Sequence, residues 1–233
     1  MLYAIGTTVT SNGIYSYPLG AGGGISAGTY AGWANDANEL AVDRLGRFVF
    51  VGGGNELWVH RVSAADAGAL SLAPFHLPDS GGYAGYYVGD IGDPHFVAVH
   101  PSLDVLYVSF SSKELGAYAY DSASGALTPL GTLPTDVDPR GVAVHPDGKH
   151  LFVAHATTGA IGVYTLGVNG SLSGRTSASA APATAIAAEP RASTSSRPAA
   201  PRSAATRSSP TEASASPARP PAPARARATP TTS

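Results

Sequence analysis

Short apolar runs separated by turn residues dominate the first three quarters of the chain. Three segments superimpose on one pattern, in which an apolar run meets a turn and a second apolar run follows: residues 40–51, 97–108 and 142–153. Alternating segments such as residues 116–120 come next, with side chains of period two. Turns such as Asp147-Gly148 supply the positive φ values that tight hairpins need. The pattern predicts short antiparallel strands.

The spacing of these units predicts how the strands are grouped. The last two units lie 45 residues apart and the first two 57 apart, the excess being a Gly/Tyr-rich insertion at residues 78–92. Four strands at a period near 45 residues are typical of a propeller blade, whereas a β-sandwich would not repeat one turn at a fixed spacing. We therefore predict an all-β propeller of about four blades. It comprises three strands of a first blade and blades near residues 37–78, 93–135 and 138–174.

Composition changes abruptly after residue 174. All but three of the residues from 175 to 233 are Ala, Pro, Arg, Ser or Thr. Such a segment cannot bury enough apolar surface to offset the entropy of ordering its backbone. We expect residues 1–174 to form the propeller and residues 175–233 to be a disordered tail, added by an altered reading frame or a faulty gene boundary.

Charge and cysteine usage exclude several classes of function. The segment 1–174 carries six basic and fourteen acidic side chains, while the tail carries eight arginines and two glutamates. An acidic body argues against nucleic acid as its partner. The chain has no cysteine for a disulfide framework or a thiolate nucleophile. With no signal-peptide pattern and no apolar run of membrane length, we expect a cytoplasmic protein that does not contact the membrane.

The opening residues add a resemblance to a known family. Residues 3–11, followed by Gly13-Ile14-Tyr15-Ser16-Tyr17, resemble the first blade of the lactonase family of seven-bladed propellers, and residues 138–149 resemble a repeat of that family. The family includes the bacterial 6-phosphogluconolactonases and the fungal carboxymuconate-lactonizing enzymes. The resemblance covers about residues 2–174 and implies a propeller that lacks some of its blades. Open blade edges would then allow self-association.

Candidate site residues follow from aligning the repeats on Ala41, Ala98 and Ala143. Three positions earlier, at the start of each first strand, stand Asn38, His95 and Arg140. The end of the second strand lies beside that position, which brings His155 near Arg140. The insertion at residues 78–92 leads into His95 and is a candidate lid.

The resemblance implies roles for these residues. His95 stands where the lactonizing enzymes have a catalytic histidine, and Arg140 matches a Pro-Arg pair whose arginine holds an anionic substrate. A guanidinium binds phosphate or carboxylate bidentately, and a histidine can activate water. We expect His95 and Arg140 to be catalytic, and Asn38, Arg140 and His155 to bind substrate. The family's acidic position, sixteen residues after the arginine, is Ala156 here, and the matching place in the His95 blade holds Phe110 or Ser111.

Three functions remain open. The first is hydrolysis of a phosphorylated sugar lactone such as 6-phosphogluconolactone, and the second is muconate-type lactonization. The third is a non-catalytic propeller that binds a partner, which Ala156 favours. We expect a small anionic substrate and no cofactor. We also expect no metal, since His95/His100 and His150/His155 are each five apart on a strand and face opposite sides. His100 and His145 recur at the same turn, which indicates a structural role.

Overall fold

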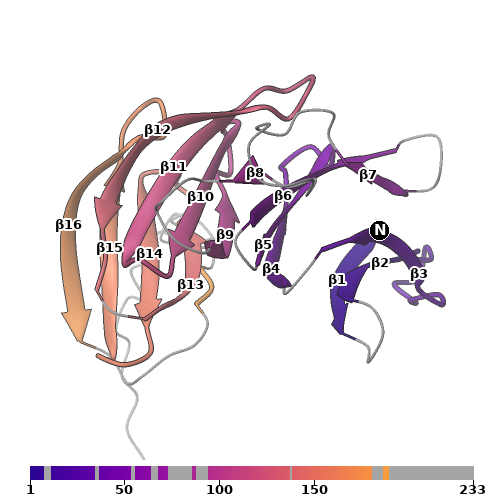
Figure 1. Ribbon diagram of the computed structural model, residues 1–233, viewed down its shortest axis with the longest axis horizontal. Coiled ribbons are helices and arrows are strands. Elements are labelled where there is room, and N and C mark those ends of the chain that lie inside the picture. The colour runs from indigo at the N-terminus through magenta and orange to yellow at the C-terminus, as the bar shows by residue number, and fades with distance from the viewer. Residues whose placement is uncertain are drawn as a thin grey trace, which may run out of the picture. The chain divides into compact units, whose positions relative to one another are not determined.

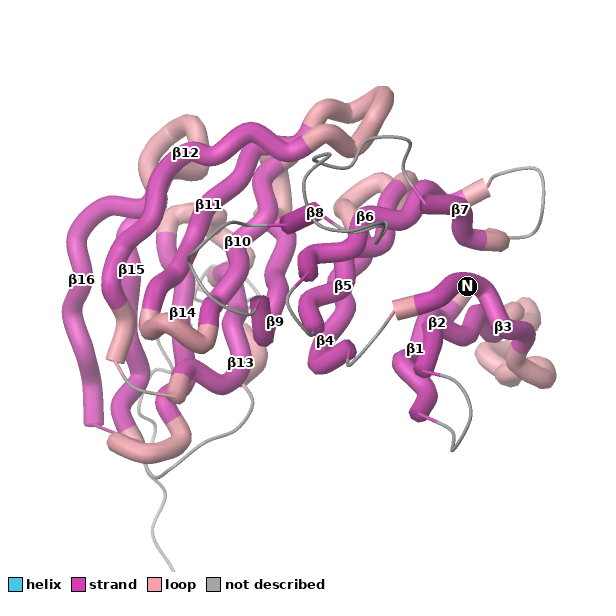
Figure 2. The backbone as a smooth tube through the Cα atoms, in the orientation of Figure 1, coloured by secondary structure: helices cyan, strands magenta, loops and turns pink. Residues whose placement is uncertain are grey.

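The computed structural model describes residues 1–7, 12–34, 37–53, 56–63, 68–72, 86–87, 94–136, 138–179 and 186–188 (Figures 1 and 2). The chain divides into two compact units, Met1–Arg191 and Ala192–Ser233, and every described residue belongs to the first. All regular elements of the described residues are β-strands, coloured magenta in Figure 2. In this part of the chain there is no helix long and apolar enough to cross a membrane.

The strands form four antiparallel sheets in chain order, labelled in Figure 1. The first sheet holds β1 (Leu2–Thr7), β2 (Asn12–Tyr17) and β3 (Thr29–Trp33). The second holds β4 (Ala37–Val42), β5 (Phe48–Gly53), β6 (Glu56–Val62) and β7 (Leu70–Leu72), with β8 (Tyr86–Tyr87) paired to β6. The third holds β9 (Pro94–Val99), β10 (Val105–Phe110), β11 (Glu114–Tyr120) and β12 (Leu127–Pro134). The fourth holds β13 (Pro139–Val144), β14 (His150–His155), β15 (Ala160–Leu166) and β16 (Leu172–Ser179).

The predicted all-β propeller with about four blades is confirmed. Each sheet is a meander in which successive strands pair, as hairpin-rich sequences with Gly-containing turns favour. The predicted blade limits agree with the strands to within a few residues, except at the last strand. There β16 continues to Ser179, past the boundary expected at residue 174. Arg175 belongs to this strand, where it pairs with Tyr164 of β15 and forms an ion pair with Asp136.

The insertion at residues 78–92 lies mostly outside the described residues. Its described part, Tyr86–Tyr87, pairs antiparallel with Glu56 and Leu57 at the start of β6. These two residues therefore add a short strand to the second blade. The expected role of the insertion as a lid stays a prediction.

The core lies between successive blades, and the two faces of each second strand supply it. All six residues of β5 are buried. Phe48 and Phe50 belong to the cluster shared with the third blade, while Val49 and Val51 belong to the cluster shared with the first. Alternate side chains point to opposite faces of a strand, so a continuous apolar run is what a strand covered on both sides requires.

The second strand of the third blade repeats this division. Leu106, Val108 and Phe110 of β10 pack toward the second blade, and Val105 and Tyr107 pack toward the fourth. Burying one such side chain contributes about 1.5–3 kcal/mol. Stacking of blades through alternate faces thus supplies most of the stability. Trp58 lies in the cluster between the first two blades.

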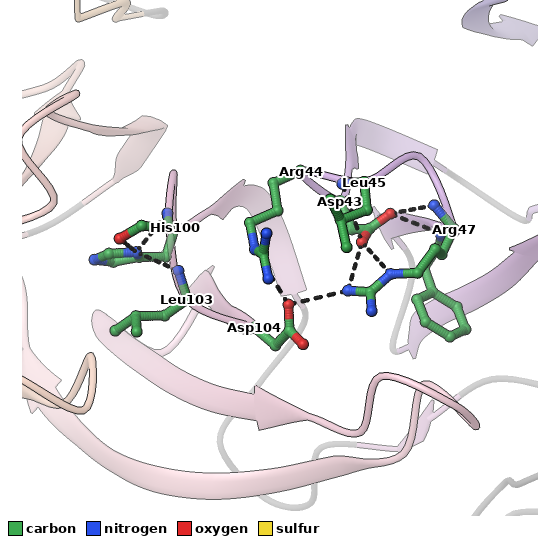
Figure 3. Close-up of polar contacts among 9 residues, drawn as sticks. Asp43, Arg44, Leu45, Arg47, His100, Leu103 and Asp104 are labelled. Atoms are coloured by element: carbon green, nitrogen blue, oxygen red, sulfur yellow. Dashed lines mark hydrogen bonds and ion pairs between the residues drawn. The ribbon is translucent and has the colours of Figure 1, made fainter.

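In the second and third blades, the turn between the first two strands is closed by one polar side chain. In the second blade, Asp43 accepts hydrogen bonds from the N–H groups of Leu45, Arg47 and Phe48 (Figure 3). Burial alone would raise the pKa of Asp43, but the bonds from Phe48 and Arg47 hold that pKa below its usual value. The carboxylate therefore stays ionised inside the turn.

The same turn ties the second blade to the third. Arg47 Nη2 lies 2.8 Å from Asp43 Oδ2 and 3.0 Å from Asp104 Oδ1. Arg44 Nε reaches the same Asp104 oxygen at 3.4 Å, so Asp104 bridges two arginines (Figure 3).

In the third blade the buried His100 takes the place of Asp43. Its Nδ1 accepts the N–H groups of Ser102 and Leu103, and its Nε2 bonds Gly148 O of the fourth blade at 2.9 Å. The predicted structural role of His100 is confirmed.

Candidate functional site

The three aligned site residues share one local geometry, a β-bulge at the start of the first strand of a blade. In the second blade, Ala37 pairs with Gly53 and Glu39 with Gly52, which leaves Asn38 as the extra residue. His95 is the extra residue in the third blade, because its neighbours Pro94 and Phe96 pair with Phe110 and Ser109.

Arg140 occupies the equivalent bulge in the fourth blade. The register shifts between Pro139, which pairs with His155, and Val142, which pairs with Val153. Gly141 follows with φ +76°, a conformation that favours glycine. Bulges bend a strand and redirect side chains, and they are common next to active sites. The repeat thus places Asn38, His95 and Arg140 at corresponding points of three neighbouring blades.

Arg140 is held by a carboxylate at the same strand start. Its Nε donates a hydrogen bond of 2.6 Å to Asp138 Oδ1, and Thr157 Oγ1 donates to Asp138 Oδ2 at 3.2 Å. The hydrogen bond from Arg140 lowers the pKa of Asp138 below its usual value, with smaller contributions from Thr157 and from His95. With one carboxylate oxygen on its Nε, the Arg140 side chain remains about half exposed.

His95 belongs to the same cluster. The first strands β9 and β13 contact each other, and His95 lies close enough to Asp138 to favour its ionised form. The imidazole is partly exposed and packs edge-on against Phe96, with ring centroids 6.2 Å apart. An imidazole, a carboxylate and a guanidinium therefore gather where the third and fourth blades meet.

His155 lies where it was expected, and its role in substrate binding stays a prediction. The side chain is fully buried, and its Nδ1 lies 3.2 Å from the backbone oxygen of Ala160. Its Nε2 accepts the N–H of Asp136 at 3.2 Å. Burial lowers the pKa of His155, which keeps the ring neutral with both nitrogens engaged by the backbone. His155 positions the segment that carries Asp136 and Asp138.

Asn38 is exposed at its bulge, and the residue after it has the more unusual environment. Glu39 faces β9, and its carboxyl accepts a hydrogen bond from the N–H of Val97. Glu39 Oε2 is buried with no hydrogen-bond partner among the described residues. Burial raises the pKa of Glu39 to about 7. Gly52, paired with Glu39, lies against the His95 backbone, where an added Cβ would be 3.3 Å from the carbonyl oxygen.

Two acidic residues were therefore missed by reasoning from the sequence. Ala156 leaves the expected acidic position at the end of β14 empty, yet Asp138 supplies a carboxylate to Arg140 from directly before β13, the strand of Arg140 itself. Asp138 precedes β13 and adopts φ +56°, so the period-two rule for strands did not predict its contact with Arg140. Glu39 gave no signal either, since its raised pKa comes from packing against the next blade.

The fold and this cluster define a propeller whose first strands carry polar side chains at bulges. A profile of the family described as "Lactonase, 7-bladed beta-propeller" matches residues 83–200, just over half of the chain. The chain belongs to this lactonase propeller family. The family resemblance seen in the sequence is confirmed.

Curated relatives agree with this assignment. The 6-phosphogluconolactonase of Yersinia pestis is 27% identical over 163 residues, which are 68% of this chain and 45% of that protein. A 6-phosphogluconolactonase of Yersinia pseudotuberculosis gives the same values. The chain thus spans less than half the length of these curated relatives.

Solved structures share the fold at low identity. A protein from Lactobacillus plantarum has a TM-score of 0.59 at 18% identity, covering 74% of this chain and 51% of its own. A protein from Bacteroides uniformis, provisionally named 6-phosphogluconolactonase, has a TM-score of 0.58 at 19% identity. It covers 77% of this chain and 52% of its own. These likenesses establish the fold alone.

Proposed function

We propose that the chain carries a lactone-hydrolysing site, with a phosphorylated sugar lactone such as 6-phosphogluconolactone as substrate. The observation that carries the proposal is the cluster of His95, Asp138 and Arg140 at bulges of adjacent blades, in a chain of the lactonase family. The names of the Yersinia relatives support the choice of substrate class.

Arg140 is the anion-binding group of this proposal. Its guanidinium is half exposed, and Asp138 fixes its orientation through Nε. A guanidinium presents parallel N–H donors that match the oxygens of a phosphate. Asp138 stays ionised beside the arginine, because the hydrogen bond from Arg140 lowers its pKa. Its carboxylate orients the guanidinium through Nε.

His95 is the proposed base. As a water oxygen attacks the lactone carbonyl carbon, the imidazole accepts the proton that the water loses. The ring C–O ester bond then breaks, and the imidazolium returns its proton to the leaving oxygen, which becomes the hydroxyl of the open acid. Glu39 is a second group of this region that can exchange a proton near neutral pH, since its pKa is about 7.

The test measures lactone opening by the purified 233-residue chain above the spontaneous rate. We expect 6-phosphogluconolactone to be opened faster than the unphosphorylated lactone, because Arg140 binds the phosphate. Arg140→Ala should raise KM by about 10- to 100-fold, the equivalent of about 1.5–3 kcal/mol for a charged hydrogen bond. His95→Gln should lower kcat by about 100-fold or more.

Arg44→Ala is the matched control, since Arg44 is a partly exposed arginine of the turn at the other end of the blade strands. It should leave both constants unchanged. Equal kcat for His95→Gln and the unchanged chain would contradict the assignment of the base. Formation of a lactone from a diacid without hydrolysis would favour lactonizing activity instead.

A further inference from the structure

The turn between β13 and β14 differs from its counterparts in carrying two histidines and an aspartate. His145 N donates to the His150 oxygen at 2.8 Å, so these residues face each other across the hairpin. Directly opposed residues of antiparallel strands project to the same face. The imidazoles therefore lie together, with ring centroids 6.2 Å apart, and Asp147 lies between them.

The donor atoms converge on one point. His145 Nδ1 lies 2.9 Å from Asp147 Oδ1, and His150 Nδ1 lies 3.3 Å from Asp147 Oδ2. One ligand atom from each residue can be chosen so that all three lie within 4.8 Å of one another. Zinc binds imidazole nitrogen and carboxylate oxygen at about 2.0–2.2 Å, which in a tetrahedron sets the ligand atoms about 3.4 Å apart. Each imidazole nitrogen is already at about that separation from one of the two Asp147 oxygens, and rotation of the partly exposed His150 can bring its nitrogen toward the oxygen that His145 contacts.

The turn is rigid enough to present these donors. Gly148, with φ +68°, donates its N–H to the His145 oxygen at 2.9 Å. Lys149 N donates to Asp147 Oδ1 at 2.8 Å, and this bond is the largest cause that lowers the pKa of Asp147 to about 2. The carboxylate is therefore ionised and oriented before any ion arrives.

We propose that His145, Asp147 and His150 bind a divalent transition-metal ion of the zinc type. Two imidazoles and one carboxylate suit zinc, nickel or copper better than calcium or magnesium, which prefer oxygen ligands. The ion replaces the Asp147 N–H, 3.2 Å away, as the partner of His145 Nδ1. Three protein ligands leave the fourth position to water. The site lies on a turn apart from the His95 cluster and does not depend on the proposed hydrolysis.

The third blade contains the same turn without the equivalents of Asp147 and His150. In the third blade, the positions of Asp147 and His150 hold Ser102 and Val105. His100 there bonds the backbone of its own turn and the fourth blade. The double substitution Asp147→Ser/His150→Val therefore gives the fourth-blade turn residues that already support the same turn one blade earlier.

Calorimetric titration with zinc chloride and with nickel chloride tests the proposal, using the full chain prepared without a histidine tag. We expect one ion per chain, and a rise of Tm on adding zinc. Asp147→Ser/His150→Val should abolish both, and His150→Gln should weaken binding by at least about tenfold. His95→Gln, which changes a histidine outside the turn, should bind as the unchanged chain does.

Two results would overturn the site: no heat of binding at submillimolar zinc or nickel, or full binding by the double variant. Nitrogen-detected NMR of the histidine rings gives an independent measurement on the unchanged chain. Zinc should shift the resonances of His145 and His150 and leave those of the buried His100 and His155 in place. If the double variant does not fold, this spectrum and the His150→Gln titration still decide the question.

Discussion

The two ends of the first strands use polar residues in opposite ways. At the turn end, Asp43 and His100 are buried and bonded to the backbone of their own turns. At the bulge end, Asn38, His95 and Arg140 leave the pairing ladder. A side chain that is hydrogen-bonded to the backbone of its turn stabilises that turn. A residue at a bulge instead projects its side chain away from the strand pairing. A repeat protein therefore uses the turn positions to keep its fold and the bulge positions to carry its function.

The largest expected effect is at the turn end. Asp43→Ala removes a fully buried carboxylate and leaves three backbone N–H groups and Arg47 without it. We expect the free energy of unfolding to fall by about 2–4 kcal/mol, because the buried N–H of Phe48 is left unpaired and the Arg47 guanidinium loses its carboxylate partner. Urea unfolding followed by circular dichroism measures the change. A loss below about 0.5 kcal/mol would mean that the turn is not stabilised by this side chain.

His100 and His145 give a matched pair for the same comparison. Both stand at the same point of the turn, but His100 is buried and links the third blade to the fourth through Gly148, while His145 is partly exposed. His100→Ala should lower the free energy of unfolding by about 1–3 kcal/mol. His145→Ala in metal-free buffer should lower it by about 0.5 kcal/mol or less. Equal losses in the two variants would contradict the distinction between them.

The carboxyl of Glu39, at the bulge end of β4, makes the free energy of unfolding depend on pH. Its pKa is about 7 in the folded chain against an ordinary value of 4.5, so the folded state binds the extra proton between these values. Stability from this group is therefore complete below about pH 4.5 and is lost as the pH rises through 7. Since Glu39 is partly exposed, we expect a loss of about 1 kcal/mol from this group between pH 5 and pH 8.

Glu39→Gln isolates this contribution. Tm measured from pH 5 to pH 8 should fall less in the variant than in the unchanged chain, and the two curves should converge at low pH. Glu114→Gln, at the first residue of β11 in the third blade, serves as the control. Parallel curves for the unchanged chain and Glu39→Gln would show that the carboxyl does not titrate near neutrality.

The sequence predicted the parts of this structure that depend on period. Apolar alternation and the 45-residue spacing located the blades, and the alignment on Ala41, Ala98 and Ala143 selected the three residues that the structure places at bulges. What it missed depends on three-dimensional packing. The raised pKa of Glu39 depends on burial against β9, and the pairing of His145 with His150 depends on the hairpin register. No metal was expected, because two histidines five residues apart on one strand face opposite sides. That rule does not apply to His145 and His150, which face each other across a turn.

The smallest expected effect on stability is at the proposed site itself. Asp138 is partly exposed, adopts φ +56°, and bonds the half-exposed Arg140. Asparagine tolerates this backbone conformation and keeps an oxygen for Arg140 Nε, so Asp138→Asn should change the free energy of unfolding by about 0.5 kcal/mol or less. The same variant loses the charge that orients the guanidinium, so lactone opening should slow by about tenfold through KM. Urea unfolding and initial rates on one preparation give both values. If the variant lost several kcal/mol of stability while its rate per folded molecule stayed unchanged, Asp138 would belong with Asp43 as a structural residue.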